Sequence, residues 1–460
     1  MRRDFLATLH CPYSGLPLSL SMELDGGGEE VTYGIVTSET TDFPIVEGIL
    51  RLHVDEYRES IVQHVRAGRR SQALTVALDR APFGGRISDA INFACSLAFR
   101  TGFNSAGERL RTLKRKRARV VSNNNAAFAE IARKLSTHSN YSHQMCRFTM
   151  PGFLSTFALT HLVRPESWVL CFACGTGHEP FLISRMWPNA KIVGADYSFC
   201  ALYMAKRYFA ESATYVCLDG DYLLPFESRQ FSTIFSSDTL PILDSKLSLA
   251  QEFKRVGDDR AVTLLPHMHN RLVSPFAKSL TPRGYRQLFR DVEVRMLPDD
   301  KVVRDYFFDD VIDLTREWSD EELAAWGQHL SVMAFRDSSG FVKTENLWEQ
   351  RMRSICHPCI NPAYRVTGRP GNWELKCQMG DFYAQTVTGI DKVCLPDTCR
   401  VIARSVDTTG LVELQRADSS QFARLVKSLV ILDLPERFMK QSHRPERGND
   451  LAPARQQAVS

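Results

Sequence analysis

The feature that most constrains the fold of this chain is an alternation of strand and helix patterns between residues 165 and 300. Short apolar runs that predict strands occupy residues 168–172, 191–195, 213–218, 231–236 and 261–266. Helical patterns occupy residues 179–186, 199–209 and 246–256. Strands that alternate with helices indicate βαβ units, which build a parallel sheet with helices on both faces. We therefore predict an α/β fold with a doubly wound sheet.

The turn after the first predicted strand is rich in small residues. Residues 169–177 have the sequence VLCFACGTG, and a predicted helix follows. Glycines in such a turn let the backbone approach a ligand closely, and the start of a helix favours negative charge. Asp196 ends the second predicted strand, 19 residues after Gly177. An acid at that point can accept hydrogen bonds from both hydroxyls of a ribose.

Three further strings complete an ordered set of five. DGDYLLPF follows the third predicted strand, FSTIFS is the fourth strand, and EFKRV precedes the fifth. Over residues 165–270 the set resembles the class I S-adenosylmethionine-dependent methyltransferases, whose strings are VLDLGCGTG, GxDxS, DxxxLPF, FDxI and ExxRV. The resemblance implies a Rossmann-like doubly wound sheet of seven strands and S-adenosylmethionine as cofactor. It also implies methyl transfer (EC 2.1.1.-) to a small-molecule or macromolecular acceptor that the sequence does not identify.

The resemblance also implies the residues that would bind the cofactor. They are Ala173, Cys174, Gly175, Gly177, Asp196, Tyr197, Asp221 and Ser236. The small residues of the turn would line the methionine and ribose end, Asp196 would hold the ribose hydroxyls, and Tyr197 would pack on the adenine. Asp221, with Asp219 as the alternative, would meet the adenine amino group. The backbone at 236–238 would face the sulfonium.

Three positions depart from the family's strings. Cys171 stands in place of the acid of the first string, Ala173 in place of its first glycine, and Ser232 in place of the aspartate of the fourth strand. These changes favour a second hypothesis, a catalytically degenerate methyltransferase fold that acts as a binding or scaffold module. The retained Gly175, Gly177 and Asp196 favour the enzyme.

Candidate catalytic residues follow the fourth and fifth predicted strands. Asp238 comes after the fourth strand, and His267 and His269 come after the fifth. In an open α/β sheet the ligands bind outside the carboxyl ends of the strands. A neutral imidazole there can take the proton of a hydroxyl or amine that attacks the methyl group. Alternatively, alignment of nucleophile and methyl group suffices without a base.

Short strand patterns separated by glycine and proline predict a β module at residues 1–55. Its opening Cys11-Pro12 and the string FPIVEGILRL resemble a small zinc-ribbon-like family that includes activator subunits of methyltransferases. That family holds zinc with two pairs of cysteines. Here Ser14 replaces the second ligand, and Val36 and Glu39 stand near the other pair. One thiolate cannot form a four-ligand zinc site, so we expect the fold without metal, with an unrelated β hairpin as the alternative.

The rest of the chain completes a prediction of five segments. They are the module at 1–55, a helical linker region at 56–120, the methyltransferase domain at 121–300, an α+β substrate or interaction region at 301–440 and a disordered tail at 441–460. Within the fourth segment, residues 315–335 have a helical pattern. The linker carries a basic run at 109–119, which leaves RNA modification as a weaker alternative, although no nucleic-acid motif accompanies the run.

Composition and cysteine usage bear on location and metals. No apolar stretch approaches the ~20 residues of a membrane helix, and the N-terminus lacks the apolar core of a signal peptide. We therefore expect a cytoplasmic protein whose twelve cysteines are reduced thiols. Cys356 and Cys359 form a single Cys-x-x-Cys pair, and Cys377, Cys394 and Cys399 follow at uneven spacing. We predict no metal site, and the oligomeric state is not indicated.

Overall fold

The computed structural model describes residues 1–460 except 26, 40, 80–125, 136–137, 379–394 and 440–460. The basic run at 109–119 and the tail predicted to be disordered lie outside the described residues. Of the predicted helical linker, helices α2 (Arg58–Arg66) and α3 (Arg70–Asp79) are described.

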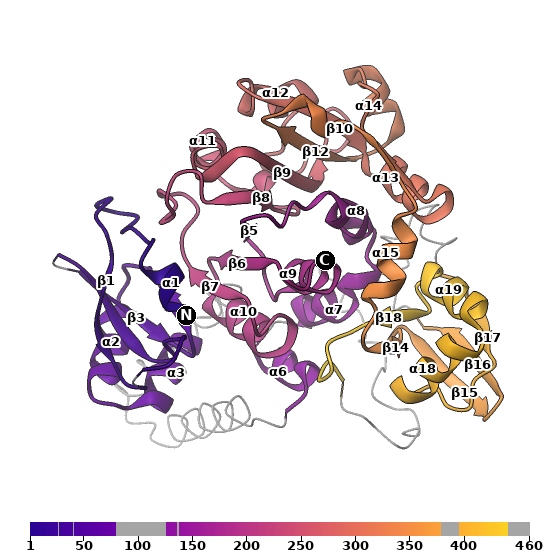
Figure 1. Cartoon of the computed structure of the whole chain (residues 1–460), viewed down its shortest axis with the longest axis horizontal. Coiled ribbons are helices and arrows are strands. Elements are labelled where there is room, and N and C mark those ends of the chain that lie inside the picture. The colour runs from indigo at the N-terminus through magenta and orange to yellow at the C-terminus, as the bar shows by residue number, and fades with distance from the viewer. Residues whose placement is uncertain (26, 40, 80–125, 136–137, 379–394, 440–460) are drawn as a thin grey trace, which may run out of the picture.

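In the described part of the chain, the main sheet has eleven strands in the order β1-β2-β3-β4-β7-β6-β5-β8-β9-β12-β10 (Figure 1). Their bounds, in chain order, are β1 Ser19–Glu23, β2 Gly34–Ser38, β3 Thr41–Val46, β4 Ile49–Arg51, β5 Trp168–Phe172, β6 Lys191–Asp196, β7 Thr214–Cys217, β8 Phe231–Phe235, β9 Gly257–His269, β10 Glu293–Pro298 and β12 His329–Phe335. Strands β4, β7, β6, β5, β8 and β9 are parallel, and β12 runs antiparallel between β9 and β10. The predicted Rossmann-like α/β fold is confirmed, with four N-terminal strands added to the seven expected.

Helices cover both faces of this sheet because successive residues of a buried strand point to opposite sides. Val169 and Cys171 of β5 belong to the core shared with helices α9 (His178–Met186) and α10 (Phe199–Met204), whereas Leu170 and Phe172 belong to the core shared with α11 (Lys246–Val256). Both β5 neighbours are parallel strands, so the continuous apolar run that predicted this strand is buried on both faces.

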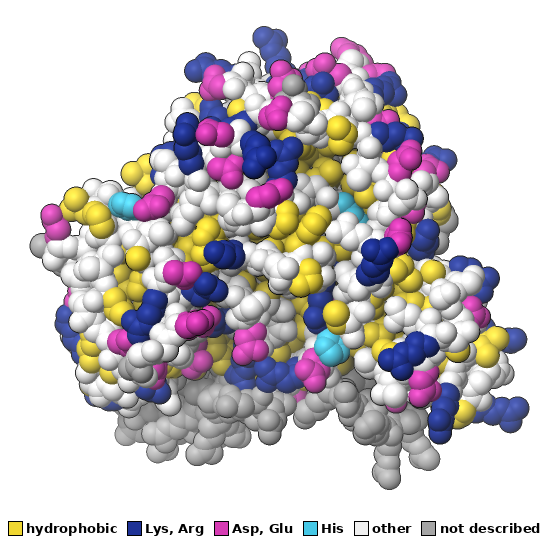
Figure 2. Space-filling model, in the orientation of Figure 1, with side chains coloured by type: hydrophobic (Ala, Val, Ile, Leu, Met, Phe, Trp, Pro, Cys, Tyr) yellow, Lys and Arg dark blue, Asp and Glu magenta, His cyan; other side chains and the backbone are white. Residues whose placement is uncertain are grey.

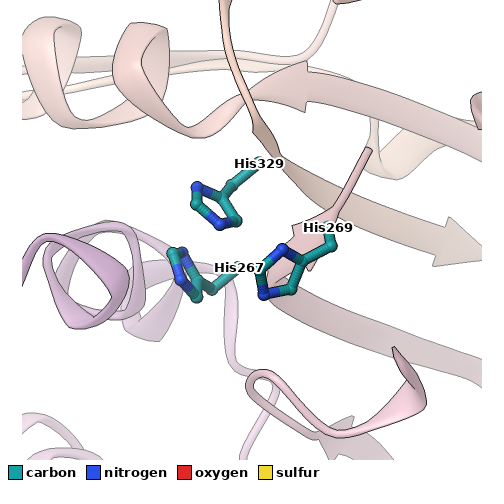
Figure 3. A group of neighbouring side chains, drawn as sticks. All are labelled: His267, His269 and His329. Atoms are coloured by element: carbon teal, nitrogen blue, oxygen red, sulfur yellow. The ribbon is translucent and has the colours of Figure 1, made fainter. Parts of the chain in front are cut away.

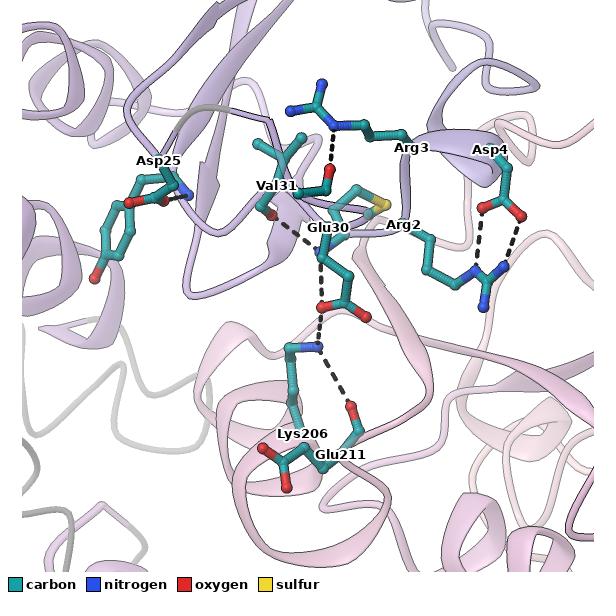
Figure 4. A network of polar contacts seen from close by, with 11 residues as sticks. Arg2, Arg3, Asp4, Asp25, Glu30, Val31, Lys206 and Glu211 are labelled. Carbon is teal, nitrogen blue, oxygen red and sulfur yellow. Dashed lines mark hydrogen bonds and ion pairs between the residues drawn. The ribbon is translucent and has the colours of Figure 1, made fainter.

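The N-terminal module continues the main sheet. Strand β4 pairs in parallel with β7, with Ile49 opposite Tyr215 and Arg51 opposite Cys217. Glu30 of the module lies 3.3 Å from the ammonium of Lys206, which also donates to the backbone oxygen of Glu211 (Figure 4). The module therefore covers the edge that β7 would otherwise expose. Its likeness to a zinc ribbon stays a prediction.

One element differs from its predicted type. The helical pattern over 315–335 forms helix α14 only at Asp320–Trp326, and residues 329–335 form β12. Gly327 follows the helix, and β12 is a central strand between β9 and β10. The main sheet thus extends past residue 300, where we placed a domain boundary. The boundaries themselves stay predictions.

The remaining described α-helices and strands lie on either side of β12 in the chain. Before β12 these are α1 Arg3–Leu6, α6 Phe128–Leu135, α7 His138–Cys146, α8 Pro151–Leu159, α12 Pro282–Leu288, α13 Asp299–Arg304 and β11 Val311–Asp313. After β12 they are β13 Lys343–Glu345, α15 Leu347–Ser354, β14 Pro358–Ile360, β15 Tyr364–Arg369, β16 Asn372–Cys377, β17 Thr398–Val401, α18 Thr408–Ala417, α19 Ser419–Lys427 and β18 Ile431–Asp433. The C-terminal part has the predicted α+β composition. Among the described residues, no helix combines the length and apolarity needed to cross a bilayer, and a cytoplasmic location stays a prediction.

Candidate functional site

The site begins where the strand order of the sheet reverses. From β5 the chain crosses to β6 and β7 on one side, and β8 and β9 lie on the other side. Ligands of doubly wound sheets bind in the crevice outside the carboxyl ends of the strands at such a reversal. Here the loop at 173–177 follows β5, and the loop at 236–238 follows β8. We therefore expect the ligand crevice between these two loops.

The backbone of the first loop has an unusual conformation. Ala173, Gly175 and Gly177 have φ values of +54°, +53° and +93°, in the left-handed region that favours glycine. A Cβ on Gly175 would meet nothing within 4 Å, whereas a Cβ on Gly177 would lie 2.6 Å from the Cβ of Ala205. Gly177 therefore allows close packing against the helix that follows β6, and Gly175 faces open space.

Asp196 connects this loop to the end of β6. One carboxylate oxygen accepts a hydrogen bond from the backbone N–H of Gly175 at 2.8 Å, and the other accepts from that of Ser198 at 2.7 Å. Burial raises the pKa of Asp196, and these two N–H donors oppose the shift. An ionised carboxylate has about four acceptor positions, so Asp196 keeps capacity for further donors.

Tyr197 extends from the next position and is 47% exposed. The ring of His53 lies beside it, with centroids 4.5 Å apart. Burial, and then the charge of Arg51, lowers the pKa of His53 to about 4, so this imidazole is neutral at pH 7. The sequence did not identify His53, because its place depends on the pairing of β4 with β7.

The other predicted cofactor residues have different environments. Asp221 is exposed, and its carboxylate accepts from the backbone N–H of Ser245 at 3.2 Å. The side chain of Cys174 is buried, and its Sγ lies 3.1 Å from the position that a Cβ on Gly194 would take. Ser236 is 1% exposed, and its hydroxyl has no hydrogen-bond partner in the structure. Cys174 can therefore reach a ligand through its backbone, and Ser236 has a free polar group.

The acid that the first string lacks is not replaced by a charged thiol. Burial raises the pKa of Cys171 well above its usual value, so Cys171 is uncharged at neutral pH. A buried carboxylate, Glu179, lies in the first turn of α9 and pairs with Arg147 at 3.3 Å. Its charge adds to the effect of burial in raising the pKa of Cys171 and Cys174, and burial raises the pKa of Glu179 itself. The sequence analysis did not single out this pair.

The predicted acceptor side lies at the same edge. Strand β9 runs three residues beyond the stretch predicted for it. His267 and His269 therefore lie at the end of this strand, and His269 is its last residue. Asp238 follows β8, and its Oδ1 lies 3.8 Å from the Nε2 of His269. The antiparallel β12 starts at this edge and places His329 opposite His269. Burial, and then His267, lowers the pKa of His329 to about 3.

His267 sits in an irregularity of the strand. Between Met268 and Leu265 the register of β9 with β12 shifts, and His267 has a φ of +60°. A β-bulge of this kind re-aims side chains and is common beside functional sites. The His267 Nδ1 lies 3.1 Å from the Oδ2 of the buried Asp299, which also accepts from the hydroxyls of Ser155 at 3.1 Å and Ser331 at 2.6 Å. With Nδ1 donating to Asp299, Nε2 is the nitrogen that offers a lone pair whenever the ring is neutral.

The cysteines that the sequence analysis considered as possible zinc ligands lie away from this edge of the sheet. The Sγ of Cys359 is 3.7 Å from the Thr408 hydroxyl, Cys356 is exposed, and Cys394 lies outside the described residues. Near Cys11, the Ser14 hydroxyl is 3.2 Å from that of Ser38 at the end of β2. In the described part of the chain, none of these thiols belongs to a cluster of possible ligands.

Comparisons with known proteins locate a family within this region. Residues 169–258 match the family model described as "Methyltransferase domain". This match runs from β5 to the start of β9 and includes the first loop, Asp196 and the loop after β8. No curated protein matches the chain.

Solved structures give weaker likenesses. The plantazolicin methyltransferase BpumL, solved with SAH, is 15% identical with a TM-score of 0.31, covering 49% of this chain and 98% of its own. A possible histamine N-methyltransferase from Thermotoga maritima is 15% identical with a TM-score of 0.30, covering 46% and 98%. Geranyl diphosphate C-methyltransferase from Streptomyces coelicolor A3(2) is 14% identical with a TM-score of 0.31, covering 47% and 84%.

Proposed function

We propose that the protein is an S-adenosylmethionine-dependent methyltransferase. The observation that carries this proposal is the coincidence of the family match at residues 169–258 with the crevice at the strand reversal. At that crevice the small-residue loop turns toward Asp196, whose carboxylate has acceptor capacity for a ribose. The fold, the family match and the local geometry therefore support the same cofactor site.

The positions of three residues at the crevice suggest which part of the cofactor each would contact. Gly175 leaves open space for a ligand beside the loop, Asp196 would hold the ribose hydroxyls, and Tyr197 with its exposed ring would pack on the adenine. His53 supports Tyr197 from the N-terminal module. When bound, S-adenosylmethionine supplies an electrophilic methyl group on a sulfonium.

The acceptor would enter next to the ends of β8 and β9. We assign His267, His269 and Asp238 to activation of the nucleophile, because they share the edge on which the crevice opens. In the displacement, the acceptor's oxygen, nitrogen or carbon forms a bond to the methyl carbon while the bond from methyl to sulfur breaks. The proton that the acceptor loses is taken up at this edge, where alignment also favours the reaction.

The second hypothesis, a degenerate fold that serves as a scaffold, has two observations in its favour. Cys171 is buried and uncharged where the family has an acid, and Ala173 has a left-handed backbone where the family has glycine. RNA as the acceptor has less support. On the face drawn in Figure 2, basic and acidic side chains are interspersed, so that face offers no continuous basic surface for nucleic acid.

A calorimetric titration with variants tests the cofactor site. The variant Asp196→Ala should lower the affinity for S-adenosylhomocysteine at least tenfold, because the ribose would lose its carboxylate acceptor. The exposed Glu227 lies outside the crevice, and Glu227→Ala is the matched control whose affinity should stay that of the unmodified protein. Equal affinity in both variants would mean that any cofactor binds elsewhere.

A further inference from the structure

Three histidines meet at the acceptor edge. His267 and His269 come from the end of β9, and His329 comes from the start of β12 (Figure 3). One nitrogen of each ring lies within 4.8 Å of the others. In the described part of the chain this is the group of His, Cys, Asp and Glu residues compact enough to hold a metal ion. The antiparallel pairing of β12 with β9 creates the group, because it brings the start of one strand to the end of the other.

The surroundings orient one of these rings. Asp299 accepts from the Nδ1 of His267 and is itself held by two serine hydroxyls. Metal-binding histidines almost always donate their second nitrogen to a carboxylate or carbonyl, which fixes the ring and its tautomer. On helix α8, a Cβ on Gly152 would lie 2.5 Å from the His267 Nε2 and 2.8 Å from both adjoining ring carbons. These near-equal distances place Gly152 over the flat face of the ring, so Gly152 does not block the lone pair in the ring plane.

Polar atoms in the same place lack partners. The Nδ1 of His269 and the Oδ1 of Asp238 are buried without a hydrogen bond in the structure. Leaving a buried polar atom unsatisfied is costly. Asp238 and His267 also have φ values of +53° and +60°, a conformation that costs energy outside glycine and that clusters at functional sites. A cation bound here would be a partner for a lone pair of this kind.

We propose that His267, His269 and His329 form a binding site for one divalent transition-metal ion, with Asp238 beside it and a coordination position open toward the crevice. Three neutral imidazoles with an open position form the donor set of catalytic zinc sites. Imidazole nitrogen also suits copper, nickel and iron, and hard oxygen-seeking ions such as Mg²⁺ fit it poorly. This proposal departs from the prediction of no metal site that was made from the sequence.

The ion would define the class of acceptor. This part of the inference rests on the proposed methyl transfer, whereas binding of the ion does not. A bound ion lowers the pKa of an oxygen ligand, so an acceptor hydroxyl placed on it would give its proton to the neighbouring Asp238 and attack as an alkoxide or phenolate. Phe276 stacks on His269 with centroids 4.4 Å apart and is 47% exposed. The site therefore fits a hydroxyl carried on an apolar or aromatic body.

Cobalt titration tests the site with full-length protein prepared without a histidine tag and stripped with a chelator. Co²⁺ should bind with one equivalent and give visible d–d absorption, and Zn²⁺ should displace it. His329→Ala should weaken Co²⁺ binding at least tenfold. Asp299→Asn should weaken it by about 10–100-fold, the range seen when a carboxylate behind a metal ligand is lost. The double variant Cys356→Ser, Cys359→Ser is the matched control and should bind Co²⁺ unchanged.

Co²⁺ affinity that is unchanged in His329→Ala, or that is lost only in the cysteine variant, would overturn the proposal. If His329→Ala shows no cooperative unfolding transition, His269→Gln replaces it with the same expectation. Calorimetry with S-adenosylhomocysteine separates the two proposals. Cobalt binding without S-adenosylhomocysteine binding would refute the methyltransferase and leave the metal site standing, and the reverse result would refute the metal site alone.

Discussion

At the scale of single residues, Ala173 shows how sequence and structure inform each other. The sequence marked it as a departure from glycine, and the structure explains the family's preference, since its φ is +54°. The predicted chemistry of Asp196 depended on a local motif and could be placed from the sequence. Asp299, His329 and His53 could not, because each reaches its partner through pairing of strands that are distant in the chain.

Replacing Ala173 with glycine should stabilise the protein. A left-handed conformation costs a non-glycine residue about 1–2 kcal/mol. The extra conformational freedom of glycine in the unfolded chain lowers the free energy of unfolding by about 0.4–1 kcal/mol and so offsets part of this gain. Ala173→Gly should therefore raise the free energy of unfolding by about 0.5–1 kcal/mol in a urea titration. Ala7 has a φ of −65° and is exposed, so Ala7→Gly is the control and should lower that free energy. A decrease of the same size in both variants would contradict this account.

At the scale of elements, local patterns predicted the strands and helices around the first loop well. The prediction of a helix over 315–335 was wrong for its second half, which forms β12. It depended on the helical spacing of the apolar residues Leu323, Trp326, Leu330 and Met333. Strand β12 is buried on both faces between two neighbours, and such a strand is apolar throughout. Periodicity alone does not distinguish it from a buried helix. The bulge at His267 is likewise a property of paired strands and has no local signal.

The connection between β5 and α9 allows a prediction with paired variants. In Gly177→Ala the new methyl group would lie 2.6 Å from the Cβ of Ala205, on top of an unfavourable φ, so the variant should lose about 2–4 kcal/mol of stability. In Gly175→Ala the methyl group meets open space, so the stability loss should be about 1–2 kcal/mol. Affinity for S-adenosylhomocysteine should nevertheless fall at least tenfold in Gly175→Ala, measured by calorimetry on folded protein. Unchanged affinity would mean that this space does not receive the cofactor.

At the scale of the whole molecule, the N-terminal module and the methyltransferase region share one sheet. The sequence predicted a separate module at 1–55, and the parallel pairing of β4 with β7 joins it to the core. Phe5 also packs on Trp168, with ring centroids 4.6 Å apart. Sequence patterns locate strands but do not state which edge accepts another strand, so this continuity was not predictable from the chain alone.

Removing the module should destabilise the core. A chain of residues 56–460 would expose the edge of β7 and the apolar surface under β1–β4, and exposed edges promote aggregation. We expect this chain to be insoluble or to elute as aggregates in size-exclusion chromatography. A chain of residues 1–439 is the control and should elute as the full protein does. A soluble 56–460 chain with an unchanged melting temperature would show that the module folds independently of the sheet.

The central claim is that the crevice at the strand reversal binds S-adenosylmethionine. Calorimetric titration of the full-length protein with S-adenosylhomocysteine tests it most directly, at protein concentrations that detect micromolar binding. The account predicts saturable binding with one equivalent per chain. Absence of binding heat at several temperatures, with protein that unfolds cooperatively, would contradict the claim and leave the scaffold hypothesis in its place.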